Sequence, residues 1–386
     1  MSELSILEQL NEVNKRVSIK EGVFGILRTL AVISRFAEEP MRKVAQESNL
    51  PVPICVAIRN EFEKLGWVSK EEKGALLTQT GHDIIKSLGG HNEDFSCSKC
   101  KGLGVSIPYS KFLEELEHIK RYSSMRNHPL TQFDQSFATP RTSLSRVLYM
   151  GHNYDLFRRN FAFLGDSDLT SIVLALFANK FSKIVVFDID QRLKEIIESA
   201  NRENALQIEF VEHDLRKPIP AKYHKKFDCI STDPPYTIHG LNLFISRGLS
   251  LLSDEHNGVG YLSFGVKPPS EALELEKSLL QMNCVITDIV PKFNQYIGAQ
   301  KLGGVSTLYR FEVIQPATPL IQKEYDGSLY TGEINPIIRT YECHKCKSNI
   351  EIGINQSIST IEDLKNKGCP HCGNESFSKT RERKME

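Results

Sequence analysis

The 386 residues of this chain suffice for two or three domains with a substantial hydrophobic core. Its 48 basic and 48 acidic side chains cancel, so no global field attracts it to nucleic acid or to an anionic membrane. No apolar run reaches the roughly 20 residues that a membrane span needs, and the start MSELSILEQLNEVNK is too polar for a signal peptide. We therefore expect a cytoplasmic protein with no membrane partner.

Residues 1–92 have the pattern of a winged helix-turn-helix domain. The segments VFGILRTLAVISRF, EPMRKVAQES and PVPICVAIRNEFEKLG predict helices, and WVSKEEKGALLTQTGHDIIKSLG predicts strand, turn, strand and helix. Such domains recognise DNA in some proteins and serve as a dimerisation or lid module in others. Because residues 1–90 hold 12 basic and 12 acidic side chains, we predict that this domain binds no nucleic acid. From the habit of this fold, we expect a homodimer formed through the same block.

A linker, residues 93–142, carries CSKCKGLG and a charged helix near residues 110–122. Cys97 and Cys100 form half of a metal site. Their spacing leaves three interpretations open: pairing with a symmetry mate, a redox couple, or the closure of a turn.

Residues 143–316 alternate between apolar strands and helical segments such as LTSIVLALFANKF and QRLKEIIESANREN. The predicted buried parallel strands are FAFLGD (161–166), KIVVFDID (183–190), IEFVEHD (208–214), FDCISTD (227–233) and GVGYLSF (258–264). CVITDIVPKF and STLYRFEVI leave no room for a helix and predict an antiparallel final pair. The predicted fold class is α/β, with a Rossmann-like seven-stranded sheet that binds ligands at its carboxyl edge.

Acidic residues stand at four successive strand ends. Asp188 follows the second strand, where a carboxylate accepts both ribose hydroxyls of a nucleoside, and Asp214 follows the third, where such folds recognise adenine. Asp168 and Asp190 have an alternative role as caps of the helices that follow them.

The turn after the first strand reads LGDSDLTS in place of Gly-x-Gly-x-x-Gly. Asp166 and Asp168 would repel a pyrophosphate or a methionine carboxylate. A co-substrate that carries an amine and no carboxylate suits this turn better. Decarboxylated S-adenosylmethionine has that property, so the turn favours aminopropyl transfer over methyl transfer.

The segment TDPPYT follows the fourth strand. Asp-Pro-Pro-Tyr occurs at this place, in Asp or Asn form, in enzymes that methylate exocyclic amines and hold the nitrogen with the acid or amide and a proline carbonyl. A polyamine nitrogen with a pKa of about 10.4 is deprotonated in roughly one molecule in a thousand at pH 7. A carboxylate beside it acts as base and electrostatic anchor, and Asp233 is the candidate.

The segments FDQSFATPRTS (133–143), LGDSDLTSI (164–172), VFDID (186–190) and TDPPYT (232–237) carry a family resemblance. Together with the N-terminal block and CSKCKG, they resemble the branched-chain polyamine synthases, or bis(aminopropyl)spermidine synthases, of thermophilic archaea and bacteria. The likeness spans roughly residues 20 to 315. Members aminopropylate the central nitrogen of spermidine, first to a tertiary amine and then to a quaternary ammonium.

The resemblance implies that Asp233 lies next to the attacking nitrogen and that Tyr236 orients this nitrogen. The residues expected to bind the co-substrate are Gly165, Asp166, Asp168, Asp188, Asp214 and Pro234. The residues expected to line the amine site are Phe133, Asp134, Gln135 and Pro235. Ser167 stands where the family pattern has a third acid, which removes one negative charge from the turn.

Residues 317–386 form a C-terminal tail with YECHKCKS and KGCPHCGN. The spacing Cys-x2-Cys-x22-Cys-x2-Cys predicts a zinc ribbon with a structural ion, whose ligands are Cys343, Cys346, Cys369 and Cys372. A ribbon of this kind binds nucleic acid, stabilises a tail or contacts a partner, and the sequence does not choose between these roles.

Two other functions remain as alternatives to an aminopropyltransferase. An S-adenosylmethionine-dependent N-methyltransferase acting on nucleic acid or protein is favoured by DPPY and the ribbon, but the acidic turn opposes it. A winged-helix regulator that senses a polyamine is the second alternative. Asp233 and Tyr236 argue against it, because a sensor needs no acid at the point of alkylation.

Overall fold

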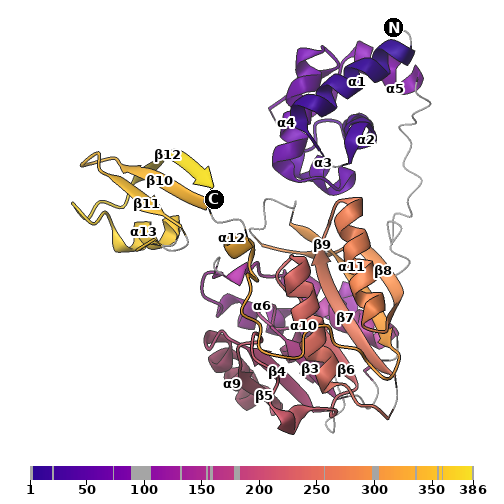
Figure 1. Ribbon diagram of the computed structural model, residues 1–386, viewed down its shortest axis with the longest axis vertical. Coiled ribbons are helices and arrows are strands. Elements are labelled where there is room, and N and C mark those ends of the chain that lie inside the picture. The colour runs from indigo at the N-terminus through magenta and orange to yellow at the C-terminus, as the bar shows by residue number, and fades with distance from the viewer. Residues whose placement is uncertain are drawn as a thin grey trace.

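The computed structural model describes residues 3–19, 21–72, 74–87, 106–130, 133–153, 155–156, 160–177, 183–255, 257–297, 304–334, 337–353, 356–358 and 360–384. They form an N-terminal helical block, a central α/β domain and a small C-terminal sheet (Figure 1). Cys97 and Cys100 lie outside the described residues. Within the described ranges, no helix is both long and apolar enough to cross a membrane.

In the described part of the chain, the N-terminal block begins with a helix that was not predicted, α1 (Glu3–Val17), and continues with helices and one hairpin in the predicted order. These elements are α2 (Gly22–Arg35), α3 (Met41–Ser48), α4 (Val52–Lys64), β1 (Val68–Lys70), β2 (Ala75–Leu77) and α5 (Gln79–Ser87). Pro40 and Pro51 directly precede α3 and α4, because proline lacks the N–H that a helix start leaves unpaired. Phe62 and Trp67 stack at 5.5 Å in a core of this block.

The central sheet has seven strands in the order β5-β4-β3-β6-β7-β9-β8. Their bounds are β3 (Phe161–Leu164), β4 (Ile184–Asp188), β5 (Ile208–Glu212), β6 (Cys229–Thr232), β7 (Gly258–Gly265), β8 (Cys284–Gln295) and β9 (Val305–Val313). β3 to β7 run parallel, and β9 pairs antiparallel with both β7 and β8. The predicted sheet with its reversed final pair is confirmed. The chain order reverses between β3 and β6, where open α/β sheets bind their ligands.

Helices cover both faces of the sheet because successive strand residues point to opposite sides. Phe161 and Phe163 pack into a core with α6 (Leu113–Ser124), α7 (Pro140–His152), α8 (Thr170–Phe177) and α9 (Arg192–Asn204). Ala162 and Leu164 pack into the opposite core with α10 (Ile238–Leu251) and α11 (Pro269–Gln281). Two short 3-10 helices, η1 (Tyr109–Lys111) and η3 (Ala221–Tyr223), complete the domain.

After β9 the chain crosses α10 and returns to the carboxyl edge of the sheet, as the orange trace in Figure 1 shows. We call residues 317–334 the strap; it ends in α12 (Thr331–Ile334). The Ile321 N–H donates to Ser246 Oγ at 3.0 Å, and the Tyr325 N–H donates to the Arg216 carbonyl at 2.9 Å. The strap is therefore packed on the central domain.

The C-terminal sheet has the order β11-β10-β12, from β10 (Ile337–Cys343), β11 (Asn349–Ile352) and β12 (Phe377–Lys384). α13 (Ile361–Lys367) lies between β11 and β12 in the chain, and its cap Thr360 accepts the Asp363 N–H. Between the N-terminal block and the central domain, Lys292 Nζ on β8 donates to Glu47 Oε2 on α3 at 2.8 Å. This ion pair joins the N-terminal block to the central domain.

Candidate functional site

The ends of β3, β4 and β6 meet at one point of the sheet edge. Thr232 Oγ1 donates to the Leu164 carbonyl at 2.8 Å, which fixes the end of β6 beside that of β3. The Asp166 N–H donates to Asp188 Oδ2 at 2.9 Å, which links the ends of β3 and β4. Gly165, between them, has φ +73°, a conformation that side chains other than glycine rarely adopt.

Arg146, on α7, holds two of the predicted acids together. Its guanidinium is buried and donates to Asp168 Oδ2 at 2.7 Å and to Asp233 Oδ2 at 2.8 Å. Its Nε donates to Asn294 Oδ1 at 2.8 Å. The second oxygen of Asp168 accepts the Ala138 N–H at 2.6 Å. The charge of Asp168 is therefore offset inside the protein, and the first turn presents less free negative charge than its sequence suggests.

Two tyrosines extend this network to the DPPY segment. Tyr296 Oη donates to Asp233 Oδ2 at 2.5 Å, and Tyr236 Oη donates to Tyr296 Oη at 3.0 Å. Ser306 Oγ, on β9, lies 2.9 Å from Tyr296 Oη. Tyr296 also forms a β-bridge with Ala138, within the FDQSFATP segment. Arg146 and Tyr296, which are 87 and 63 residues away from Asp233 in the sequence, thus fix the position of its carboxylate.

Burial determines the acidity of the carboxyl groups at this edge. It raises the pKa of Asp166 to about 7 and that of Asp188 to about 6. It raises the pKa of Asp233 to about 6, although the neighbouring Arg146 guanidinium opposes this shift. Because a nearby positive charge favours the ionised form of a carboxyl group, these acids favour a cationic ligand.

Asp166 and Asp188 accept their hydrogen bonds from the backbone. Asp166 accepts the N–H groups of Thr170 and Ser171 at 2.8 and 3.0 Å, and Asp188 Oδ1 accepts the Asp190 N–H at 2.8 Å. The cap of α8 is therefore Asp166, and the alternative role of Asp168 as this cap is not found.

Asp190 has the alternative role that was predicted for it, at the start of α9. Its Oδ1 accepts the Arg192 N–H at 3.1 Å, and the Arg192 side chain donates to both of its oxygens. Asp190 therefore caps the helix, while Asp188 lies at the carboxyl end of β4.

The segment 133–135 lies against the strap and the end of β4. The ring centroids of Phe133 and Tyr330 are 5.4 Å apart, and Asp134 Oδ2 accepts the Thr331 N–H at 2.6 Å. Gln135 Nε2 donates to Asp190 Oδ2 at 3.1 Å. The network around Asp233 and this segment are thus two separate parts of the carboxyl edge.

The remaining predicted residues stand in the loops after β5 and β6. Asp214 Oδ1 accepts the Arg216 N–H at 2.9 Å. Pro234 and Pro235 are buried, and the Pro235 carbonyl accepts the Thr237 N–H at 2.7 Å. Thr237 in turn caps α10 through the Gly240 N–H. The DPPY turn therefore leads directly into a capped helix, which makes it rigid.

The partners of Asp233 were not identified from the sequence. Its direct partners are Arg146, on α7, and Tyr296, just after β8. Behind them, Asn294, on β8, accepts from Arg146, and Ser306, on β9, pairs with Tyr296. Each is a polar side chain in a segment that otherwise reads as buried, SLSRVLYMG, KFNQY or VSTLYRF. A polar side chain inside an otherwise apolar segment is the signal by which the sequence could have identified these residues.

The four cysteine thiols of the tail come together at one point. Their Sγ atoms all lie within 4.8 Å of one another, with 3.6 Å between Cys343 and Cys372 and between Cys346 and Cys369. Tetrahedral zinc with Zn–S bonds of about 2.3 Å separates its sulfur ligands by about 3.8 Å. The thiols therefore fit a zinc ion.

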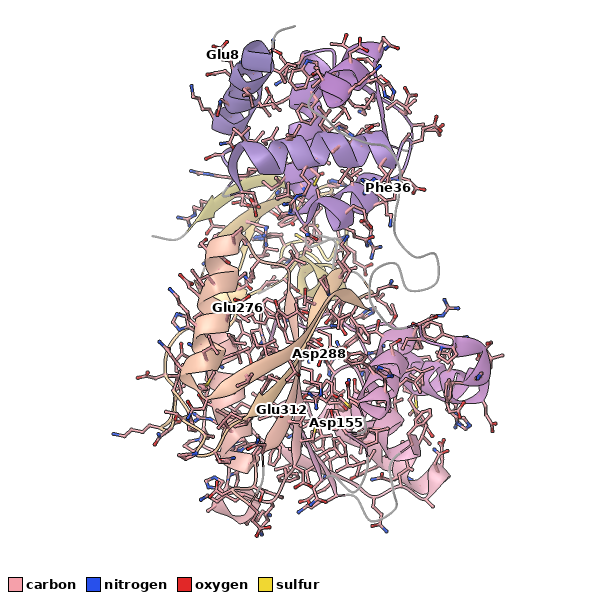
Figure 2. All side chains as sticks on the ribbon, turned by 90° about the vertical axis from the view of Figure 1, so that its right-hand side faces the viewer. Glu8, Phe36, Asp155, Glu276, Asp288 and Glu312 are labelled. Carbon is pink, nitrogen blue, oxygen red and sulfur yellow. The ribbon has the colours of Figure 1, made fainter. Side chains whose placement is uncertain are left out.

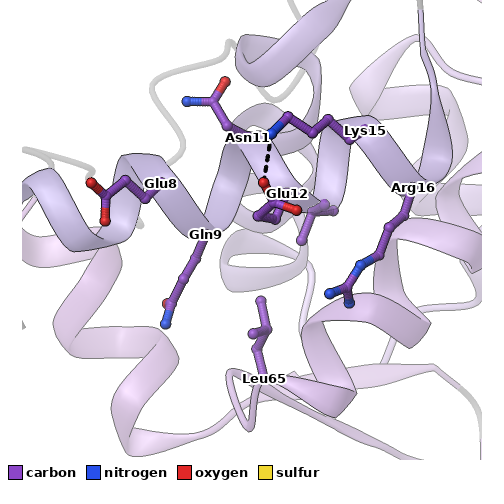
Figure 3. A pocket seen from close by; sticks show the side chains of 8 residues that line it. Glu8, Gln9, Asn11, Glu12, Lys15, Arg16 and Leu65 are labelled. Atoms are coloured by element: carbon purple, nitrogen blue, oxygen red, sulfur yellow. Dashed lines mark hydrogen bonds and ion pairs between the residues drawn. The ribbon is translucent and has the colours of Figure 1, made fainter.

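Two other polar features lie elsewhere. A hollow between α1 and the end of α4 is lined by polar and charged side chains, including Glu12 and Lys15, which form an ion pair (Figure 3). Past the end of α7, Arg310 Nε donates to Asp155 Oδ2 at 2.9 Å, with Glu312 close by (Figure 2). Arg310 ties β9 to the residues that follow α7, which is a structural role.

Comparison with known proteins gives a consistent family. The model of the branched-chain polyamine synthase A C-terminal domain matches residues 114–363. An uncharacterized protein of Methanocaldococcus jannaschii is 34% identical over 97% of this chain and 93% of its own length. The N(4)-bis(aminopropyl)spermidine synthase of the same organism is 40% identical over 66% of this chain and 73% of its own length.

A solved structure has the same fold. It is the branched-chain polyamine synthase of Thermus thermophilus in complex with N4-aminopropylspermidine and 5'-methylthioadenosine. The likeness has a TM-score of 0.68 at 24% identity and covers 86% of this chain and 99% of that one. The family match covers the sheet, the Arg146 network and the strap, and on this evidence the chain belongs to the branched-chain polyamine synthase family.

Proposed function

We propose that this chain transfers aminopropyl groups from decarboxylated S-adenosylmethionine to the internal nitrogen of a linear polyamine such as spermidine. The products are a branched-chain polyamine and methylthioadenosine, and the chain is an aminopropyltransferase. The observation that carries this proposal is the Asp233 carboxylate, which Arg146 and Tyr296 fix at the end of β6. The family match and the named synthases among its relatives support the same reaction.

Asp233 is the residue that receives the attacking amine. Among the described residues, its hydrogen bonds all end on Oδ2, and its side chain is 18% exposed. Its Oδ1 is therefore directed to the nitrogen, as acceptor for the N–H and as electrostatic anchor. Tyr236 acts beside it through Tyr296, and Pro235 lines the same turn.

The reaction is an in-line displacement at carbon. The nitrogen lone pair forms a C–N bond to the methylene carbon next to the sulfonium, the C–S bond breaks, and its electron pair neutralises the sulfur. In the first addition the nitrogen also loses a proton, and the proposed acceptor of this proton is Asp233. Because the sulfonium is already a good leaving group, the protein contributes mainly position and electrostatics.

The nucleoside part of the co-substrate is assigned to the other acids. Asp188 binds the ribose hydroxyls, Asp214 binds adenine, and Gly165 and Asp166 lie beside the sulfonium and its aminopropyl arm. Pro234 closes this part of the turn. Asp168 contributes to co-substrate binding indirectly, by holding Arg146 in place, because both oxygens of Asp168 already accept hydrogen bonds within the protein.

The amine is assigned to the space between Asp233 and the segment 133–135. Phe133, Asp134 and Gln135 line its entrance in this proposal, and the cationic amine is attracted by the acids of the edge. Ser167, in place of a third acid, reduces the negative charge there. This difference in charge allows the chain to prefer another amine than its named relatives do.

Mass spectrometry of the products tests the reaction. The protein is incubated with spermidine and either S-adenosylmethionine or its decarboxylated form. We expect aminopropyl addition with methylthioadenosine release from the decarboxylated donor, and a loss of at least about 100-fold in Asp233→Asn. Glu255→Gln, on an exposed turn, is the control. Methyl transfer from S-adenosylmethionine, or an unchanged amine with the decarboxylated donor, would contradict the proposal.

For the domains, we infer that residues 1–92 form a winged helix-turn-helix domain. Its helix order and antiparallel hairpin support this assignment. α6 and the strap pack on the central domain, which supports a catalytic unit wider than residues 143–316, from residue 106 to residue 334. The linker 93–142 and the tail 317–386 then each contribute part of this unit.

The balanced charge of the N-terminal block supports a role as a dimerisation or lid module that binds no nucleic acid. A mobility-shift experiment with duplex DNA at low salt tests this, and a salt-dependent shift would overturn it. The homodimer is also a proposal, and sedimentation at the monomer mass would reject it.

The C-terminal sheet is assigned as a zinc ribbon with a structural ion. Its ligands are Cys343, Cys346, Cys369 and Cys372. Four thiolates leave no open coordination position for chemistry, so the ion stabilises the sheet.

A further inference from the structure

The strap is fixed at the carboxyl edge of the sheet. Thr237 Oγ1, directly after the DPPY segment, donates to the Leu329 carbonyl at 2.9 Å. Two residues further, the Thr331 N–H donates to Asp134 at 2.6 Å. The strap is thus attached both to the segment that carries Asp233 and to the segment 133–135.

Tyr330 is the strap residue held between these attachments. Its side chain is buried, and the Phe133 ring centroid is 5.4 Å from its own. The Arg216 guanidinium lies 5.1 Å from the Tyr330 ring centroid. Glu333 accepts both the Arg216 guanidinium, at 2.7 and 2.9 Å, and the Tyr330 N–H, at 3.1 Å. Ring and backbone are therefore both fixed.

The groups around Tyr330 belong to the ends of β4 and β5. The Arg216 N–H donates to Asp214, after β5, and Gln135, two residues beyond Phe133, binds the loop after β4. Burial raises the pKa of the Tyr330 hydroxyl, and the charges of Asp214 and Asp188 raise it further. Through Arg216 and Phe133, Tyr330 is thus connected to the loops that carry both carboxylates assigned to the nucleoside.

Arg247, on α10, connects the strap to the loop after β5. Its buried guanidinium donates to four backbone carbonyls: those of Leu215 and Arg216 in the loop at 2.9 Å each, and those of Ile321 and Lys323 in the strap at 2.8 and 2.7 Å. Four carbonyls at these positions need the planar fork of arginine, which the single ammonium of lysine cannot reproduce.

We propose that Tyr330 forms a wall of the nucleoside site and that Arg247 is a positioning residue that holds this wall against Asp188 and Asp214. The ring excludes water from one side of the nucleoside, which strengthens the hydrogen bonds of the two carboxylates. The inference rests on the proposed donor. It concerns the nucleoside part that decarboxylated S-adenosylmethionine shares with methylthioadenosine.

Calorimetric binding of methylthioadenosine to the full chain tests the wall. We expect Tyr330→Ala to raise the dissociation constant about tenfold, and Tyr330→Phe, which keeps the ring, to change it by less than about threefold. Tyr325→Phe is the matched control, because it removes a tyrosine hydroxyl from the same strap, one that donates to the Ser328 carbonyl. An unchanged dissociation constant in Tyr330→Ala would overturn the inference.

The kinetic constants test the positioning role. In Arg247→Lys we expect the KM of the donor to rise about tenfold, with the KM of spermidine within about twofold of the wild type. Equal rises of both constants would indicate general loosening and overturn the role. Failure of Arg247→Lys to fold would show a general structural role for Arg247 and would also overturn the positioning role. Wild-type binding of methylthioadenosine without aminopropyl transfer would reject the proposed reaction and leave the wall supported, since binding needs no turnover.

Discussion

The two halves of the carboxyl edge hold their acids by different means. Asp168 and Asp233 share the buried guanidinium of Arg146, so their charges are compensated within the protein. Asp166 and Asp188 accept backbone N–H groups, and burial raises the pKa of both. The half assigned to the amine is held by these contacts without any ligand. The half assigned to the nucleoside would gain a positive charge with the sulfonium co-substrate in the proposed reaction.

The largest expected effect follows from removal of Arg146, which holds Asp168 and Asp233 together. Arg146→Met leaves the buried carboxylate of Asp168 and the largely buried carboxylate of Asp233 without their cation, and we expect the free energy of unfolding to fall by about 3 to 5 kcal/mol. Denaturant unfolding measures this loss. The control is Arg121→Met, whose exposed ion pair with Glu203 contributes at most about 1 kcal/mol. Equal losses in the two variants would show that the Arg146 network does not stabilise the fold.

The pH dependence of stability tests the raised pKa values of Asp166 and Asp188. Asp166 and Asp188 have folded-state pKa values of about 7 and 6, above the value of about 3.9 in an unfolded chain. Between pH 4 and pH 7, roughly, the folded state therefore binds more protons than the unfolded state, and the free energy of unfolding falls as pH rises. Asp188→Asn should remove about 1 to 3 kcal/mol of this fall, measured by denaturant unfolding at several pH values.

Asp254→Asn, an exposed change, is the control for this titration. An identical pH dependence in the wild type and Asp188→Asn would refute the assignment. The same charge argument predicts that the cationic donor binds more tightly as pH rises through this range, while neutral methylthioadenosine changes less.

The smallest expected effect on catalysis is at the cysteine cluster, away from both halves. Cys369→Ser should lose the zinc ion and expose the amides of β10 to β12 to hydrogen exchange, while aminopropyl transfer stays within about twofold of the wild type. Metal analysis and hydrogen exchange measure this. Ser376→Ala, in the same ribbon, should retain zinc. Loss of catalysis in parallel with zinc would show that the ribbon supports the active site.

The extent to which the site was predictable follows from how its residues are distributed. Asp188 and Asp233 were identifiable because each ends an apolar run that reads as a buried strand, and parallel strands bring their ends to one edge. Tyr296 and Arg146 are 150 residues apart, yet their side chains meet at 3.0 Å. No local pattern encodes such a contact, since it depends on how α7 packs against β8.

The acidic turn shows the same limit for electrostatics. From the sequence, Asp166 and Asp168 are two equal charges in one turn. In the structure, one caps α8 and the other pairs with Arg146. The family indicated by the turn is confirmed, although the simple count of charges behind that argument overstated the free charge.

The strap shows the limit for chain organisation. Residues 317–334 lack a regular pattern and were assigned to the tail, but Leu329 and Tyr330 are buried in a core of the central domain. Their position depends on Arg247 and on carbonyl groups that every residue carries, so side-chain identity alone gives little signal.

The sequence by itself determined the strand and helix order of the central domain, the acids at the strand ends, the DPPY turn and the cluster of four cysteines, because periodicity and short-range spacing encode these features. Only the tertiary structure decided which acids keep their charge free, which tyrosine contacts Asp233, and where the strap ends. Those outcomes depend on burial and on contacts between distant segments, which exist only once α7, β8, β9 and the strap have packed around the same sheet edge.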